Sequence, residues 1–175
     1  MLPAMRDAAT EILRTVPGTR FVLGLAPTIE RDLVVQHLAG GPPVEIVEGQ
    51  THAVIRAADV GLVTSGTVTL ETALLGTPMV VCYRLSFVSE LLARLVLRVP
   101  WVSLANLTLG RAVVPELYRR TTTGERLARE ALRLLTDAGA REAQRAAFSE
   151  LAGQLGEPGV GARAARLVLA QAGAA

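Results

Sequence analysis

Four continuous apolar segments, separated by helix-like segments, constrain this chain more than any other feature of its sequence. They lie at 20–27, 44–47, 60–63 and 78–83, and the last reads Pro-Met-Val-Val-Cys-Tyr. A strand with one face in water alternates apolar and polar residues, whereas these runs show no such alternation. The pattern predicts a parallel sheet that is covered by helices on both faces.

Amphipathic segments between and after these strands predict the covering helices. Apolar residues at helical spacing place them at 2–16, 28–38, 51–59, 66–75, 86–98, 115–119, 123–136, 138–155 and 161–172. Thr28 is predicted to cap the second of them, because a threonine oxygen accepts a hydrogen bond from a first-turn N–H. The segment 101–104, Trp-Val-Ser-Leu, is predicted as a last short strand.

The fold class that follows is α/β, a Rossmann-like parallel sheet with a helical C-terminal tail. A chain of 175 residues is enough for one domain, so we expect 1–175 to be a single domain that ends in helices over 138–173. Domains of this kind usually begin with a strand, whereas the first predicted element here is a helix. We therefore expect the first strand of the domain to be missing.

Composition excludes several classes of function. The net charge is only +2, and no arginine-dense run is interleaved with aromatic residues, so nucleic-acid binding is not expected. Cys82 is the single cysteine, which rules out an intramolecular disulfide and argues against a cysteine-based metal site. We expect no metal, no cofactor and a reducing cytoplasm. No charge-free run approaches the roughly 18 residues of a membrane span.

Residues 64–71, Thr-Ser-Gly-Thr-Val-Thr-Leu-Glu, are where chemistry is expected. They follow a strand, and in open α/β sheets ligands bind beyond the carboxyl ends of the strands. Ser65 and Thr67 flank Gly66, which lets the backbone approach a ligand closely. The first N–H groups of the next helix have no partners inside the helix, so they form a site for an anion such as phosphate. Glu71 could then accept hydroxyls of a ribose.

Two other interpretations of this stretch stay open on the residues alone. Serine and threonine are good helix caps, and Glu71 complements the helix dipole, so the loop could be purely structural. A hydrolase with a triad of Ser65, His52 and Asp59 would rest on nearness in sequence only, because the chain has no Gly-x-Ser-x-Gly motif.

Two longer blocks carry a resemblance to a known family. They are VTSGTVTLETALLGTPMVVCYRLS, residues 63–86, and WVSLANLTLGRAVVPEL, residues 101–117. Together they resemble the C-terminal half of lipid-A-disaccharide synthase, a glycosyltransferase family with the GT-B fold. Residues 25–32 and 47–59 resemble their counterparts too, so the likeness covers nearly the whole chain.

The resemblance implies that this domain holds the nucleotide of a UDP-sugar donor. Gly66 and Thr67, beside Ser65, would face the diphosphate, and Glu71 would face the ribose. The residues implied in the donor site are Ser65, Gly66, Thr67, Glu71, Tyr83, Arg84 and Asn106. Arg84 would offset diphosphate charge, and Asn106 would be a donor-site amide. The structural alternatives are a solvated charge for Arg84, a turn residue for Asn106, a dipole partner after Pro115 for Glu116, and a helix surface for His37. His52 is expected behind a Thr51 cap, near the uracil.

Two departures from the family pattern matter. Leu104-Ala105-Asn106 stands where the family usually has Leu-Pro-Asn, so this turn is less rigid. The family's first strand ends in a Gly-Ser-Arg loop that helps to bind the donor phosphates, and neither this loop nor the N-terminal domain is in the chain. Since that domain brings the lipid acceptor site and the acidic catalytic residues, the resemblance implies half an enzyme with no catalytic residue of its own.

The activity implied for the full-length relative is an inverting, metal-independent transfer. It would move 2,3-diacylglucosamine from its UDP carrier to 2,3-diacylglucosamine 1-phosphate, forming the lipid A disaccharide and releasing UDP, at the cytoplasmic face of the inner membrane of a Gram-negative bacterium. The helix 86–98 with Trp101 is a candidate for membrane contact, with packing on the sheet as the alternative. The rival functions are another UDP-sugar enzyme of this fold, such as a UDP-N-acetylglucosamine epimerase, and a non-catalytic nucleotide-binding fragment.

Overall fold

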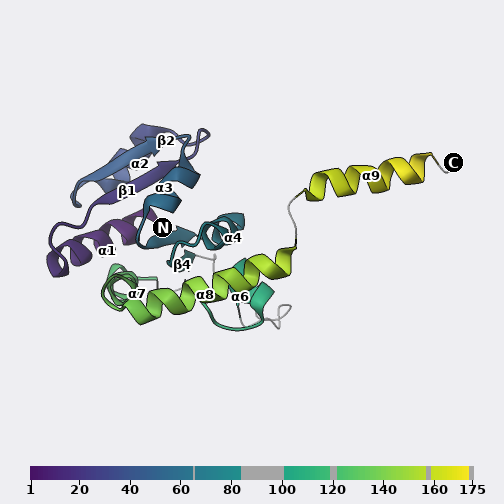
Figure 1. Ribbon diagram of the computed structural model, residues 1–175. Coiled ribbons are helices and arrows are strands. Elements are labelled where there is room, and N and C mark those ends of the chain that lie inside the picture. Colours follow the sequence, from purple (N-terminus) through teal and green to yellow (C-terminus); the bar gives the residue numbers. More distant parts are fainter. Residues whose placement is uncertain (65, 84–100, 119–121, 157–158, 174–175) are drawn as a thin grey trace, which may run out of the picture.

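The computed structural model describes residues 1–64, 66–83, 101–118, 122–156 and 159–173 (Figure 1). The predicted helix 86–98 and two predicted site residues, Ser65 and Arg84, lie outside these ranges. The helices in the described ranges are α1 Leu2–Thr15, α2 Arg31–Leu38, α3 Thr51–Ala57, α4 Thr67–Leu74, α6 Leu104–Leu109, α7 Gly124–Thr136, α8 Ala138–Leu155 and α9 Val160–Ala172.

The strands all pair in parallel, in two ladders. They are β1 Phe21–Leu25, β2 Val44–Glu48, β3 Gly61–Thr64, β4 Met79–Tyr83 and β5 Glu116–Tyr118. β1 pairs with β2, while β4 lies between β3 and β5, so that Val81 is opposite both Val63 and Glu116. Within the described residues the two ladders form separate sheets. Parallel pairing places the carboxyl ends of β3, β4 and β5 at one edge, where the predicted site begins.

β4 is buried at all five positions, because helices cover both of its faces. Met79, Val81 and Tyr83 pack in a cluster with residues of α4, α6 and α8, such as Ala73, Ala105 and Phe148. Val80 and Cys82 point to the other face and pack against α1 and α7 through the residues Ala8, Ile12, Leu127, Ala128, Ala131 and Leu134. The prediction of a parallel sheet covered on both sides is confirmed, and the apolar run 78–83 is explained.

Cys82 is fully buried in this strand. Desolvation by burial raises the pKa of its thiol to about 12. The thiolate is the reactive form of cysteine, so this side chain behaves as a small core residue and takes no part in chemistry.

Several predictions of local structure were wrong. Thr51 is not a cap, because α3 begins at Thr51 itself and Gln50 precedes it. Residues 116–118 form the strand β5 instead of part of a helix, because β4 offers the ladder partners that Pro115 and Glu116 take. The segment 101–104 is not a strand: Ser103 caps α6, which begins at Leu104. α2 begins at Arg31 after Glu30, so Thr28 is not its cap.

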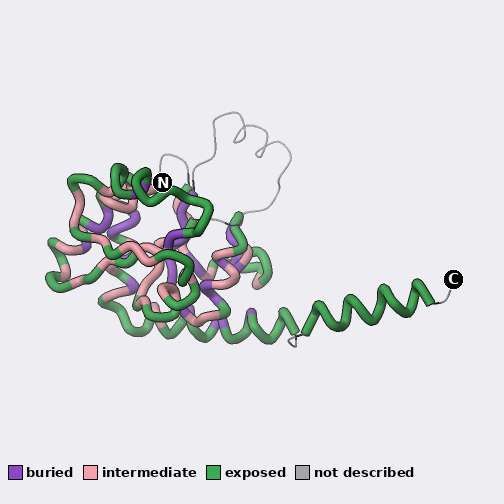
Figure 2. The backbone as a smooth tube through the Cα atoms, turned by 90° about the horizontal axis from the view of Figure 1, so that it is seen from above, coloured by how far each residue is buried: buried purple, intermediate pink, exposed green. Residues whose placement is uncertain are grey.

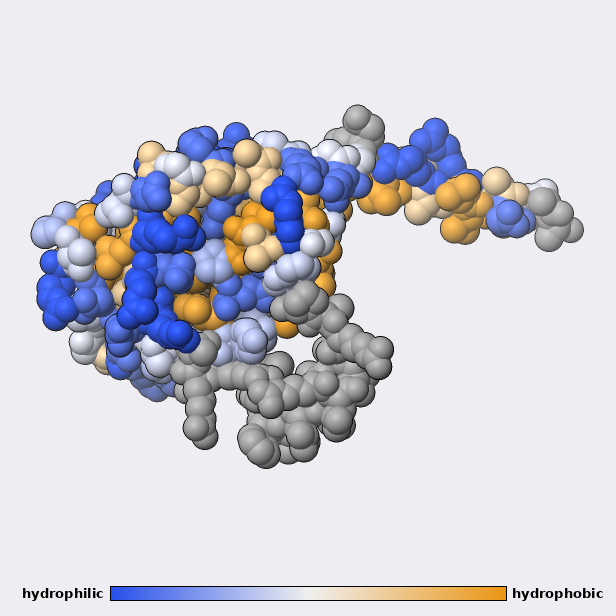
Figure 3. Space-filling view, turned by 90° about the horizontal axis from the view of Figure 1, so that it is seen from below, coloured by the Kyte–Doolittle hydropathy of each residue, from blue (hydrophilic) through white to orange (hydrophobic). Residues whose placement is uncertain are grey.

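The chain ends in two helices of different character. α8 packs along α4, α6 and α7, whereas α9 projects away from the body (Figures 1 and 2). Every described residue of α9 is exposed, including the apolar Val160, Leu167, Val168 and Leu169, and apolar surface is visible along this helix in Figure 3. None of the described helices has the length and apolar character needed to cross a membrane.

Gln144 ties α8 to the start of β4. Its Oε1 accepts a hydrogen bond from the Met79 N–H at 2.8 Å, and its Nε2 donates to the Met79 carbonyl at 3.2 Å. The side chain is only 3% exposed, so water cannot replace either bond. A single amide thus satisfies two buried main-chain groups at the base of the central strand.

Replacing Gln144 with leucine is therefore expected to destabilise the chain strongly. Two buried backbone groups would lose their partners, which costs about 2–4 kcal/mol of unfolding free energy in total. The matched control is Gln154→Leu on the exposed side of the same helix, which should change the free energy by less than about 0.5 kcal/mol. Urea denaturation of both variants measures this, and equal values would contradict the assigned role.

Candidate functional site

The turn between β3 and α4 depends on one glycine. Gly66 has φ 151° and ψ −168°, a conformation that essentially only glycine adopts. A Cβ at this position would meet nothing within 4 Å, so the requirement comes from the backbone and not from crowding. The exposed Gly66 opens α4 and leaves the first N–H groups of that helix facing the edge of the sheet.

α4 turns one face to the core and another to solvent. Thr69, Thr72 and Ala73 are buried, and the Thr69 hydroxyl donates to the Gly66 carbonyl at 2.8 Å. Thr67 and Glu71 are four residues apart, so they lie on the same face of the helix. Thr67 is exposed and Glu71 is partly exposed. The start of the helix and the carboxylate are therefore open to a ligand on one side.

Glu71 contacts His52, the second residue of the neighbouring helix α3. The His52 Nε2 lies 2.9 Å from the Glu71 Oε2. The two side chains are 71% and 42% exposed, so the pair is at the surface of the predicted site. The Glu71 Oε1 has no partner among the described residues.

Two tyrosines stack where β4 and β5 end. The rings of Tyr83 and Tyr118 have centroids 5.7 Å apart with an interplanar angle of 12°. Tyr83 is 8% exposed, whereas Tyr118 is 39% exposed, so Tyr118 presents the outer ring of the stack. The pair forms an aromatic wall at the carboxyl ends of β4 and β5.

Asn106 is fully buried in α6 and binds a loop on the far side of the helix. Its Oδ1 accepts the N–H groups of Val113 and Val114 at 2.7 and 2.9 Å. Its Nδ2 donates to the Val114 carbonyl at 3.0 Å and to the Glu116 Oε1 at 2.7 Å. Four hydrogen bonds use the full capacity of a side-chain amide, so Asn106 holds β5 against α6 in this structure.

The Glu116 carboxylate completes this network. Its oxygens also accept the N–H groups of Val102 and Ser103 at 2.8 and 3.1 Å. The expected role of Glu116 as a dipole partner in its own helix is wrong, since it lies in a strand and binds the residues before α6. The resulting tie fixes both β5 and the segment at Val102, next to residues that the structure leaves undescribed.

The structure brings together most of the predicted site residues that it describes. Gly66, Thr67 and Glu71 share one surface, Tyr83 ends the neighbouring strand, and Asn106 lies buried beneath. His52 also lies at this edge; the resemblance placed it near the uracil but not among the donor-site residues. Tyr118, which was not predicted, ends the neighbouring strand β5. Tyr118 was missed because residues 115–119 were predicted as a helix, whereas residues 116–118 form β5.

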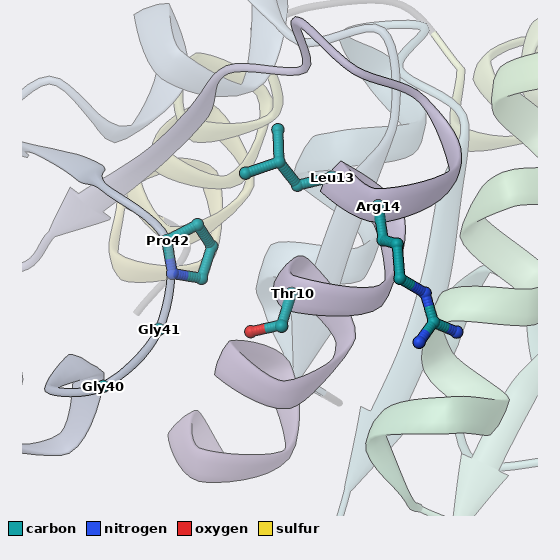
Figure 4. Close-up of a pocket in the computed structure, with 6 residues that line it drawn as sticks. All are labelled: Thr10, Leu13, Arg14, Gly40, Gly41 and Pro42. Atoms are coloured by element: carbon teal, nitrogen blue, oxygen red, sulfur yellow. The ribbon is translucent and has the colours of Figure 1, made fainter.

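Two hollows among the described residues lie elsewhere. One of about 310 Å³ is lined by Thr10, Leu13, Arg14, Gly40, Gly41 and Pro42, and a neighbouring one of about 520 Å³ reaches Arg20 and Glu45 (Figure 4). Both are near the amino ends of β1 and β2. The Arg14 guanidinium points away from Pro42 and pairs with Glu11 at 2.6 Å, so no charged group is aimed into the first hollow. The chemistry-bearing residues gather at the opposite ends of the strands.

A comparison with models of known families gives a match over most of the chain. The model of the lipid-A-disaccharide synthetase family matches residues 1–169. This chain belongs to that family. It is 44% identical over 171 residues to a lipid-A-disaccharide synthase from Anaeromyxobacter dehalogenans strain 2CP-C, and 41% identical over 170 residues to one from Myxococcus xanthus strain DK1622. These alignments cover 97% of this chain but 45% and 44% of the relatives, so the chain spans less than half their length.

A solved structure shows a similar fold. It is the crystal structure of a protein from Listeria monocytogenes named as a UDP-N-acetylglucosamine 2-epimerase, with a TM-score of 0.57 and 18% sequence identity. The match covers 82% of this chain and 34% of that one. At this identity the likeness supports the fold, and the family membership rests on the sequence comparisons.

Gly66→Ala is expected to destabilise the chain through backbone strain. The conformation of Gly66 costs about 1–3 kcal/mol for a residue with a side chain. The control is Gly110→Ala, because Gly110 adopts the milder left-handed conformation (φ 63°, ψ 19°) and also has free space around it. Urea denaturation should show a larger loss of unfolding free energy for Gly66→Ala than for Gly110→Ala. A loss no greater than that of the control would show that the conformation of this turn does not require glycine.

Proposed function

We propose that this chain is the donor-binding half of a lipid-A-disaccharide synthase. In the complete protein, 2,3-diacylglucosamine would pass from its UDP carrier to 2,3-diacylglucosamine 1-phosphate, with release of UDP. The observation that carries the proposal is the shared open face of α4, where the Gly66 turn, Thr67 and Glu71 lie at the carboxyl end of β3 in a member of this family.

The diphosphate would bind at the start of α4. The N–H groups of Thr67 and Val68 precede the first hydrogen bonds inside the helix and carry the positive end of its dipole. The Thr67 hydroxyl adds a donor at the same place, and the exposed Gly66 brings no side chain that would keep a phosphate at a distance. Charge that develops on departing UDP would be stabilised by these fixed donors.

The remaining predicted residues would complete the site from the neighbouring strands. Ser65 and Arg84 are proposed to contact the diphosphate, and Tyr83 to support the wall at the end of β4. Asn106 is proposed to act on the donor through the segments that it ties together, Val113–Glu116 and α6. This role fits its burial, because its amide is already engaged within the chain.

The acceptor and the catalytic acids are proposed to belong to a part of the protein outside this chain. The relatives are more than twice as long, and the two strand ladders are separate within the described residues. β1 and β3 also keep half-exposed positions, whereas β4 is buried throughout. A further strand between the ladders would bury these positions. The chain by itself is proposed to bind UDP without transferring a sugar, and the whole protein to work at the cytoplasmic face of the inner membrane.

One other function has an observation in its favour. The fold resembles that of the named UDP-N-acetylglucosamine 2-epimerase, and such an enzyme would keep the same nucleotide-binding edge. The blocks around Asn106 and Gly110-Arg111 are shared with the synthase family and favour transfer over epimerisation. Product analysis separates the two, since transfer releases UDP and forms a disaccharide whereas epimerisation does neither.

Glu71→Ala should weaken the binding of UDP by about 1–3 kcal/mol. The ribose hydroxyls would lose a charged acceptor, and the expected loss is on the scale of charged hydrogen bonds. Isothermal titration calorimetry of the chain with UDP measures the change. Glu150→Ala, which removes an exposed carboxylate of α8, is the control and should leave the affinity unchanged. An unaltered affinity in a folded Glu71→Ala chain would exclude Glu71 from the site.

The complete enzyme is expected to keep its activity in EDTA. The described part of the chain brings no three His, Cys, Asp or Glu side chains close enough to hold a metal ion, and the proposed charge stabilisation comes from helix N–H groups and arginine. Turnover is measured on the full-length protein with and without EDTA. A loss of turnover that Mg²⁺ or Mn²⁺ restores would favour a metal-assisted mechanism instead.

A further inference from the structure

We propose that His52 is a positioning residue that aims the Glu71 carboxylate at the ribose. This inference rests on the proposed nucleotide site and adds a residue to it. The observation is the contact between the His52 Nε2 and the Glu71 Oε2 at 2.9 Å, which joins two helices at the ligand-facing edge. No motif or resemblance in the sequence pointed to this pair.

The chemistry of the two groups fixes the direction of the bond. An ionised carboxylate can only accept hydrogen bonds, so the Nε2 of His52 must carry the proton. Imidazole donates from this atom when it is charged or when it is the neutral Nε2–H tautomer. The Glu71 Oε1 has no partner among the described residues, and it keeps lone pairs free for the ribose hydroxyls.

The helix that carries His52, α3, is held by contacts near both of its ends. Gly24 of β1 lets α3 approach closely, since a Cβ there would lie 3.3 Å from the Cα of Thr51. The turn before α3 is tied to β1 by a bond from the Gly49 N–H to the Leu25 carbonyl at 3.2 Å. At the other end, the Thr77 hydroxyl donates to the Ile55 carbonyl at 2.7 Å.

Glu71 comes from an equally anchored helix. The Thr72 hydroxyl donates to the Val68 carbonyl at 2.7 Å, and the Thr77 N–H donates to the Thr72 carbonyl at 3.2 Å. Thr77 therefore links α3 and α4, and the distance between their exposed side chains is set by buried contacts. These ties keep the two side chains within reach of each other.

Exposure argues that the contact serves binding and not folding. Both side chains are more than a third exposed, and hydrogen-bonded pairs in water contribute little to stability. A free glutamate loses the freedom of several rotatable bonds when it engages a ligand. Holding it beforehand lowers that cost and favours the ligand that uses it. His52 should therefore affect recognition of the ribose more than the stability of the chain.

The test compares the affinities of the chain for UDP and for 2′-deoxy-UDP by calorimetry. His52→Ala should weaken UDP about fivefold, the scale of one ordinary hydrogen bond, and should weaken 2′-deoxy-UDP less. His52→Gln, which retains an N–H donor at similar reach, should restore most of the preference for UDP. His37→Ala, the other histidine on an exposed helix surface, is the control and should change neither affinity.

The double variant identifies the route of the effect. If His52 acts through Glu71, the His52→Ala/Glu71→Ala chain should bind UDP no more weakly than Glu71→Ala alone. Additive losses would overturn the inference, as would equal losses for both nucleotides in His52→Ala. If Glu71→Ala weakens UDP while His52→Ala does not, the inference fails and the nucleotide site stands. If neither the wild-type chain nor its variants bind UDP through Glu71, the nucleotide site fails and the inference fails with it.

A ligand-free measurement gives a second readout. Long-range ¹H–¹⁵N spectra of the histidine ring should show the proton of neutral His52 on Nε2, and Glu71→Ala should shift the Nε2 signal. His37 supplies the reference ring. A neutral His52 protonated on Nδ1, with Nε2 bare, would contradict the proposed donation to Glu71.

Discussion

The burial of β4 on both faces is the constraint on which the rest of this structure depends. An extended segment sends alternate side chains to opposite sides, so Val81 and Tyr83 need a helical cover on one side while Val80 and Cys82 need one on the other. Each fully buried side chain of this size contributes about 1.5–3 kcal/mol relative to exposure. The two clusters together hold α4, α6 and α8 against one face, and α1 and α7 against the other.

This arrangement also decides where function can be placed. Because β3, β4 and β5 are parallel, their carboxyl ends meet at one edge, and each following segment starts there. The core residues provide no ligand-binding groups at this edge, but they fix the positions of the helices that provide them. Thr77 bonds to α3 and α4 at once, and Asn106 with Glu116 fixes α6 to β5. The exposed surface formed by Gly66, Thr67, Glu71 and His52 therefore rests on a buried frame of hydrogen bonds.

The sequence predicted the parts of the fold that local pattern determines. The four long strands, most of the covering helices and the Gly66 turn each have a signal within ten residues or so, and these are present in the described residues, whereas the helix predicted at 86–98 lies outside them. Residues 116–118 could not be assigned in this way, because Pro115-Glu116 also begins helices well and the deciding partner, Val81, is more than thirty positions away. Ser103 was missed as a cap for a different reason, because Trp-Val-Ser-Leu has the composition of a strand.

The site residues likewise divide into those that local sequence identifies and those that depend on distant partners. Gly66, Thr67 and Glu71 form one local motif, and the sequence located them on a strand-to-helix turn. His52 contacts Glu71 across nineteen positions and Asn106 contacts Glu116 across ten, so their roles depend on how separate elements pack. Asn106 shows the limit most clearly. The resemblance marked it as important, but only the structure shows that its amide binds main-chain groups of Val113 and Val114.

The most direct test of the central claim is an NMR titration of the ¹⁵N-labelled chain with UDP. If the start of α4 holds the diphosphate, the amide signals of Gly66, Thr67 and Val68 should shift first and most, and uridine, which has no phosphate, should shift them far less. Residues that line the hollow near the amino end of β2, such as Gly40 and Gly41, should stay unchanged. Shifts concentrated at Gly40 and Gly41, or equal shifts with uridine and UDP, would contradict the placement of a nucleotide diphosphate at this helix.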